Sequence, residues 1–84
     1  MYKIMLADDE GIVIDSLKFI IEKEFKDICE VQYAETGRSV IELAESFRPD
    51  IAVMDIQMPG INGIDAMKEI RRTNNHTVFI VTVS

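Results

Sequence analysis

The sequence contains one cysteine, no tryptophan and no long apolar run, and each shortage excludes a class of protein. A single thiol, that of Cys29, cannot form an internal disulfide, so we interpret it as a half-buried apolar residue without a chemical role. No segment approaches the ~18 consecutive apolar residues of a membrane span, and the apolar run near the first residue is too short for a signal peptide. These absences predict a cytoplasmic protein that does not bind membranes.

Positive charge is scarce as well. Nine Lys and Arg side chains stand against fifteen Asp and Glu, which gives a formal net charge of −6. Because binding to a nucleic acid backbone needs a stripe of positive charge, we expect no direct nucleic acid binding by this segment. Apolar residues make up 48% of the chain and no low-complexity tract interrupts them, which predicts one packed domain over residues 1–84.

Short apolar runs predict four strands. Residues 4–7 and 51–54 are continuous apolar runs that end at acidic residues, a pattern typical of strands buried on both faces of a parallel sheet. Val31 and Tyr33 alternate with a polar residue and predict a strand between these two. Residues 78–83 predict the fourth.

Helical spacing of apolar residues predicts a helix after each of the first three strands. The first covers residues 12–25, and the second begins after the capping residue Thr36 and ends before Pro49, because the residue before a proline is disfavoured in a helix. The third opens at the conformationally permissive Gly63. Its predicted apolar residues are Ile64, Met67 and Ile70. The predicted buried residues of the first helix are Val13, Leu17, Ile20, Ile21 and Phe25.

This alternation of strands and helices predicts the fold class. Strands joined through helices of this length imply right-handed crossovers and a parallel sheet with helices on both faces. We therefore expect an α/β protein with a doubly wound sheet, in which ligands bind at the carboxyl edge where the strand order reverses.

Acidic residues follow two of the predicted strands. Asp8 and Asp9 come after the first strand, and Asp55 comes after the third. The carboxyl ends of parallel strands lie along one edge and neighbouring strands are only about 4.8 Å apart, so the three side chains converge if these strands are neighbours. The alternative is that Asp8 and Glu10 cap the first helix, where acids are common.

Three converging carboxylates repel one another unless a cation lies among them. Carboxylate and carbonyl oxygens, without a nearby His or Cys, suit Mg²⁺ or Mn²⁺, and such a site also receives phosphate oxygens. A carboxylate beside the metal can attack phosphorus and form an aspartyl phosphate. Asp55 is the better candidate for this role, because it stands alone at its strand end and precedes a sharp Met58-Pro59-Gly60 loop.

Two stretches, LADDE at residues 6–10 and PDIAVMDIQMPGING at residues 49–63, resemble the receiver domain of two-component response regulators, and the resemblance covers the whole chain. It implies a flavodoxin-like sheet with strand order 2-1-3-4. It also implies that a sensor histidine kinase phosphorylates Asp55. Asp9 and the backbone carbonyl of Gln57 would bind the metal together with Asp55, and Asp8 would act largely through bound water.

The same resemblance implies a Ser or Thr at the end of the fourth strand that hydrogen-bonds the phosphoryl group. Ser84 and Thr82 both fit this position, and we favour Ser84 with Thr82 as the alternative. A full receiver domain continues with a fourth helix, a fifth strand that carries a lysine, and a fifth helix, which this sequence lacks. Residues 1–84 are therefore predicted to be a partial receiver domain.

The sequence of the first helix and of the Met-Pro-Gly loop resembles that of regulators that carry an AraC-type helix-turn-helix domain. This similarity predicts that the full-length parent binds DNA and regulates transcription.

Two other functions compete with the phosphoacceptor. A metal-dependent phosphatase of the haloacid-dehalogenase kind would carry a second acid two residues after its nucleophile, but that position is Gln57, so we do not expect an enzyme. The other alternative is an interaction module without phosphorylation competence. Its uncovered sheet edge would pair or exchange elements with a second copy and form a homodimer.

Overall fold

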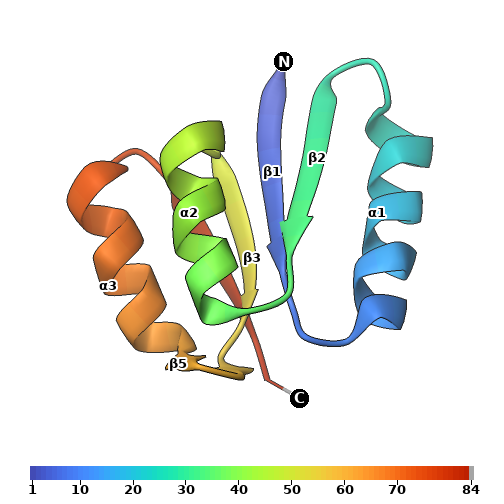
Figure 1. The fold of residues 1–84 in the computed structure, drawn as a ribbon. Coiled ribbons are helices and arrows are strands. Elements are labelled where there is room, and N and C mark those ends of the chain that lie inside the picture. Colours follow the sequence, from blue (N-terminus) through green and yellow to red (C-terminus); the bar gives the residue numbers. More distant parts are fainter. Residues whose placement is uncertain (84) are drawn as a thin grey trace.

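A parallel sheet with helices on both faces forms the centre of the computed structural model, which describes residues 1–83 (Figure 1). The elements follow the chain as β1 (Tyr2–Ala7), α1 (Gly11–Phe25), β2 (Cys29–Ala34), α2 (Gly37–Phe47), β3 (Ile51–Asp55), the short strands β4 (Gln57–Met58) and β5 (Ile61–Asn62), α3 (Gly63–Thr73) and β6 (Val78–Thr82). No helix within these residues is long and apolar enough to cross a membrane.

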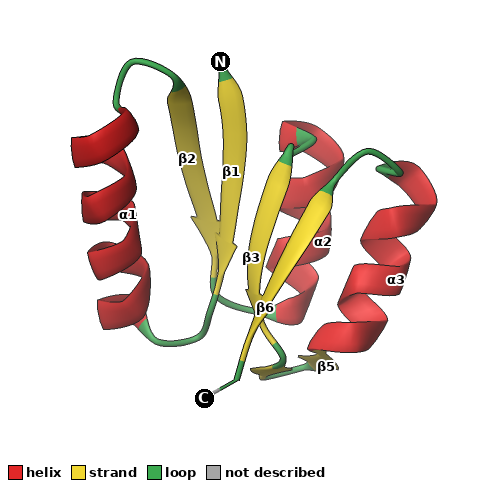
Figure 2. Cartoon of the chain, turned by 180° about the vertical axis from the view of Figure 1, so that it is seen from behind, coloured by secondary structure: helices red, strands yellow, loops and turns green. Residues whose placement is uncertain are grey.

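The strand order confirms the predicted fold class. The four-stranded sheet has the order β2-β1-β3-β6, which is the predicted 2-1-3-4 order with β6 as the fourth strand. All three strand pairs are parallel. α1 covers one face, and α2 and α3 cover the other, as the view from behind makes clear (Figure 2). The chain therefore winds in both directions from β1, and the tips of β1 and β3 lie side by side.

Side chains that alternate along the strands fill two separate cores. The larger core lies between the sheet and helices α2 and α3, and it includes Met5, Ala52, Met54, Val40 and Ile70. The smaller core joins Ile4, Leu6 and Ile14 beneath α1. On this second face the sheet is covered unevenly, because Val78 and Ile80 of β6 remain 59% and 51% exposed.

The structure corrects the predicted faces of two helices. In α1 the fully buried residue is Ile14, whereas Ile20 and Phe25 are 54% and 49% exposed. In α3, Ala66 and Ile70 are buried but Ile64 is not. Leu17 and Ile21 do pack against the smaller core as predicted. The error in α1 arises because helical spacing alone does not fix how the helix is rotated on the sheet.

The predicted limits of α2 are confirmed. The Thr36 side chain accepts a hydrogen bond from the Ser39 N–H, and the Ser39 hydroxyl accepts one from the Thr36 N–H, which makes a reciprocal cap. The helix ends at Phe47 because Arg48, the residue before proline, leaves the right-handed helical region with φ 52°.

The loop after β3 contains a hairpin that the sequence pattern did not predict. β4 and β5 pair in antiparallel fashion, with Gln57 opposite Asn62 and Met58 opposite Ile61. Pro59 and Gly60 form the turn, and Gly60 has φ 90°, a conformation that favours glycine. The hairpin makes the segment after Asp55 an ordered element of the fold.

The contrast between Ile14 and Ile20 yields a prediction about stability. Ile14→Ala should lower the free energy of unfolding by about 2–5 kcal/mol, because it leaves a cavity in the smaller core. Ile20→Ala, the same change in the same helix at an exposed position, should cost about 0.5 kcal/mol or less. Urea denaturation followed by circular dichroism measures both. Equal losses for the two variants would contradict the assigned face of α1.

Candidate metal centre

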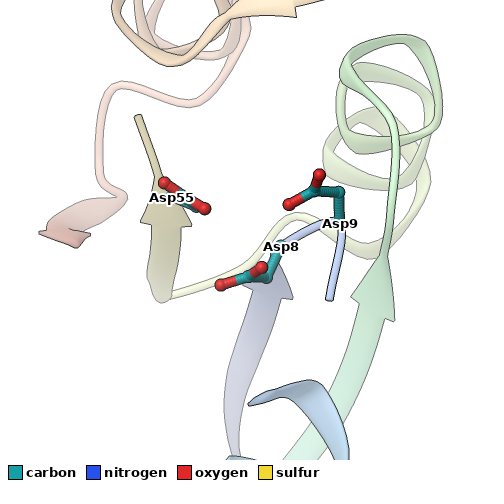
Figure 3. A group of neighbouring side chains, drawn as sticks. All are labelled: Asp8, Asp9 and Asp55. Atoms are coloured by element: carbon teal, nitrogen blue, oxygen red, sulfur yellow. The ribbon is translucent and has the colours of Figure 1, made fainter. Parts of the chain in front are cut away.

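The sheet brings the three predicted acids together at its carboxyl edge. Asp8 and Asp9 directly follow β1, Asp55 is the last residue of β3, and these two strands are neighbours in the sheet. One carboxylate oxygen from each of the three side chains lies within 4.8 Å of the others. Figure 3 shows the three carboxylates arranged around one gap between the strand tips. The predicted convergence is confirmed.

Local hydrogen bonds hold two of these carboxylates in place. Asp55 Oδ1 accepts a hydrogen bond of 3.0 Å from the N–H of Gln57, and Asp8 Oδ1 accepts one of 2.9 Å from the N–H of Glu10. Both bonds run from an aspartate to the backbone two residues later, the turn that aspartate favours. The loops that follow the two strands therefore orient the acids toward the gap.

The second oxygen of Asp55 has no partner within residues 1–83. Asp55 is 1% exposed, and its Oδ2 atom is buried without a hydrogen bond among these residues. A buried carboxylate oxygen that loses its water and gains no donor is destabilising by roughly 1–3 kcal/mol or more. This orphaned oxygen, inside a cluster of acids, is the feature that a bound cation would satisfy.

The structure shows no side-chain capping of α1 by Asp8 or Glu10. Glu10 occupies the N-cap position of α1, but no side chain caps the helix there. The carboxylate of Asp8 bonds to the N–H of Glu10, which lies outside the helix. Asp8 is thus not explained as a cap, whereas Glu10 stands at the start of α1 and outside the acidic cluster.

No basic side chain neutralises the cluster in the part of the chain that the structure describes. The ion pairs there join Arg38 to Glu42 on α2 and Arg72 to Glu69 on α3, and neither touches the three acids. Oxygen ligands alone, from carboxylates and neighbouring backbone, are the donor set that Mg²⁺ and Mn²⁺ prefer over zinc. The residues present therefore fit a hard divalent ion.

An open pocket adjoins the cluster. It has a volume of about 840 Å³ and is lined by Asp9, Ile64 and the loop that contains the hairpin. Gln57 belongs to this lining and is exposed. The pocket thus opens beside Asp9 and the residues that follow Asp55. Metal binding by the Gln57 carbonyl stays a prediction.

Of the two candidate hydroxyl residues, only Thr82 is described. Thr82 pairs with Asp55 in the register of β3 and β6, and its Oγ1 donates to the carbonyl of Met54 at 3.4 Å. Ser84, the residue favoured from the sequence, lies outside the described residues. The choice between them stays a prediction.

Sequence reasoning missed a residue at the base of the loop. Gly37, the first residue of α2, is buried against the hairpin, and its N–H donates to the carbonyl of Pro59 at 3.3 Å. The signal was a glycine placed directly after a capping residue, at a helical position where glycine is disfavoured.

Comparison with known proteins places this chain among receiver domains. The family model described as response regulator receiver domain matches residues 4–84. The uncharacterized transcriptional regulatory protein YesN of Bacillus subtilis is 36% identical over 81 residues, which are 96% of this chain and 22% of YesN. The chemotaxis protein CheY of Thermotoga maritima is 37% identical over 79 residues, which are 94% of this chain and 64% of CheY.

A solved structure agrees with the sequence relatives. The response regulator domain of Thermotoga maritima CheB superposes with a TM-score of 0.88 and 32% sequence identity, covering 100% of this chain and 61% of that domain. This chain thus spans about a fifth of the length of YesN and less than two thirds of the matched CheB domain.

The cluster predicts that Mg²⁺ stabilises the fold. An ion that binds the folded chain alone should raise the free energy of unfolding by about 2.7 kcal/mol at 100 times its Kd. Asp9→Asn should abolish most of this gain, whereas Glu10→Gln, a neighbouring acid outside the cluster, should preserve it. Urea titrations with and without MgCl₂ measure the difference. A gain that persists in Asp9→Asn would place the ion elsewhere.

Proposed function

Because this chain belongs to the response regulator receiver domain family, we propose that it is a phosphoacceptor module whose Asp55 receives a phosphoryl group beside a divalent metal ion. The observation that supports this proposal best is the buried Oδ2 of Asp55, which has no hydrogen-bond partner among the described residues and lies within a cluster of three acids. Mg²⁺ is the proposed ion, with Mn²⁺ as the substitute. The proposed donor is the phosphohistidine of a sensor histidine kinase.

The chemistry is a transfer between two nucleophiles. A carboxylate oxygen of Asp55 forms a bond to phosphorus while the bond from phosphorus to the donor's imidazole nitrogen breaks, and that nitrogen keeps the electron pair. The product is an acyl phosphate on Asp55. When bound, the metal would offset the negative charge that gathers on the phosphoryl oxygens.

In this reaction the residues of the chain would hold the Asp55 carboxylate and the metal ion in position. The N–H of Gln57 holds Oδ1 of Asp55, so the carboxylate does not rotate freely. We propose that Asp9, Asp55 and the Gln57 carbonyl ligate the ion and that Asp8 acts through water. Asp55 itself is 1% exposed, and we propose that the donor approaches through the open pocket beside Asp9 and Gln57.

We propose that phosphorylation is read out as a change of surface. The new phosphoryl charge would attract a hydroxyl at the end of β6, Ser84 in our assignment and Thr82 as the alternative, and so bias a two-state element. Two of the relatives are named as transcriptional regulatory proteins. We therefore propose that the full-length protein regulates transcription and binds DNA through a domain outside this segment. A role in the cytoplasm is part of this proposal.

Acetyl phosphate tests the phosphoacceptor directly. Incubation with acetyl phosphate and MgCl₂ should add one phosphoryl group to the intact mass. Asp55→Asn should remove the adduct, because the amide cannot form an acyl phosphate, whereas Asp65→Asn on the exposed face of α3 should keep it. An adduct that survives in Asp55→Asn would refute Asp55 as the acceptor. Many phosphates released per chain without an adduct would favour a phosphatase.

A second proposal concerns self-association through β6. Its side chains Val78, Ile80 and Val81 are 59%, 51% and 42% exposed, and no charge or proline interrupts the strand. The opposite edge strand, β2, carries the exposed polar residues Glu30 and Gln32. Uncharged apolar edges pair readily with another strand. We propose that two copies of the 84-residue chain pair their β6 strands about a two-fold axis.

Matched lysine substitutions test the β6 contact. The chain should form dimers at rising concentration in sedimentation velocity, and added salt should favour them by screening the net charge of −6 on each copy. Ile80→Lys should keep the chain monomeric, whereas Gln32→Lys at the other edge should not. A monomer at every concentration, or equal effects of the two variants, would contradict edge pairing by β6.

A further inference from the structure

We infer that Gly37, which contacts none of the three acids, is a positioning residue for the metal-binding loop. This inference rests on the proposed metal site and adds a residue that would affect its metal affinity through the hairpin. The loop from Ile56 to Asn62 carries Gln57 and begins immediately after Asp55. Gly37 of α2 and Gly63 of α3 both lie close to this loop.

The contact at Gly37 leaves no room for a side chain. A Cβ atom built on Gly37 would overlap Cγ2 of Ile61 and lie 2.6 Å from Cβ of Ile61 and 3.2 Å from its backbone nitrogen. A rotamer change could move Cγ2 of Ile61, but Cβ of Ile61 is fixed to the backbone, so the 2.6 Å contact would remain unless the hairpin moved. Gly37 is needed here for space and not for its backbone angles, since its φ is not positive.

A second glycine, Gly63, lies against the start of the loop. A Cβ atom on Gly63 would lie 2.6 Å from Cα of Ile56 and 3.0 Å from the carbonyl oxygen of Asp55. The N–H of Gly63 donates to the carbonyl of Ile56 at 2.9 Å. The role of Gly63 is thus close approach between backbones, and the conformational permissiveness predicted from the sequence is not what this position uses.

These contacts connect Gly37 to the site through the hairpin. Ile61, which packs on Gly37, lies opposite Met58, and the neighbouring pair joins Asn62 to Gln57. The N–H of Gln57 then bonds to Asp55 Oδ1 at 3.0 Å. A displacement of Ile61 therefore moves the strand whose first residue holds the acceptor carboxylate and supplies the proposed carbonyl ligand. Side chains that orient ligands in this indirect way tune metal affinity.

The test compares two glycines that each open a helix. Gly37→Ala should weaken Mg²⁺ binding about 10-fold, as measured by isothermal titration calorimetry on the folded chain. Gly11→Ala, at the first residue of α1, should leave the Kd unchanged, because a Cβ there meets nothing within 4 Å. Circular dichroism without metal verifies that each variant is folded before the titration.

Two further variants keep the inference testable if Gly37→Ala does not fold. Ile61→Ala removes the side chain that packs on Gly37 and should by itself weaken Mg²⁺ binding. The double variant Gly37→Ala/Ile61→Ala removes the Cγ2 overlap and should bind Mg²⁺ more tightly than Gly37→Ala alone. In the wild-type chain, the amide signals of Asp9 and Gln57 should shift in NMR spectra as Mg²⁺ is added.

The outcomes separate the inference from the proposed function. If the wild-type chain and Gly11→Ala bind Mg²⁺ while folded Gly37→Ala and Ile61→Ala bind it equally well, Gly37 has no positioning role. If the wild-type chain does not bind Mg²⁺ at all, the metal site itself is refuted. A purely structural role for Gly37 would lower stability in urea but leave the Kd of the folded chain unchanged, which also overturns the inference.

Discussion

Parallel pairing of β1 with β3 is the constraint on which the rest of the structure depends. It places Asp8, Asp9 and Asp55 within 4.8 Å of one another although two of them are separated from the third by more than half of the chain. Two like charges ~4 Å apart repel by about 1 kcal/mol in water and by about 4 kcal/mol at the effective dielectric near a protein surface. The apolar residues of the two cores hold the strands together against this repulsion.

Much of this arrangement follows from the sequence by physical rules. Continuous apolar runs predict buried parallel strands, and the acids at their ends then have to meet at one edge if the strands are neighbours. Thr36 and Pro49 mark the limits of α2 because capping and the restriction before proline are local effects. The acidic cluster was predictable for this reason, since it depends on strand ends and not on details of packing.

The features that were missed depend on tertiary contact. Whether Ile14 or Ile20 is buried depends on how α1 is rotated on the sheet, and helical spacing alone leaves that rotation open. The hairpin of β4 and β5 has two residues in each strand, too few to show a period. Position 37 needs glycine because Ile61, which is distant in the chain, lies against it. Position 63 needs glycine because the backbone of Ile56 lies against it. A local pattern can mark such a glycine, as Gly37 after the capping residue Thr36, but it does not say which segment approaches it or how closely.

The position of β6 affects the backbone that follows Asp55. Within residues 1–83 this strand pairs with β3 alone, and the carbonyl of Thr82 accepts the N–H of Ile56, the residue that follows Asp55. Edge segments with exposed side chains open first in native-state fluctuations. Fraying of the last residues of β6 would release the backbone of Ile56 and loosen the peptide that follows Asp55. Among the described residues, the backbone next to the Asp55 carboxylate therefore depends on the hydrogen bond that the end of β6 supplies.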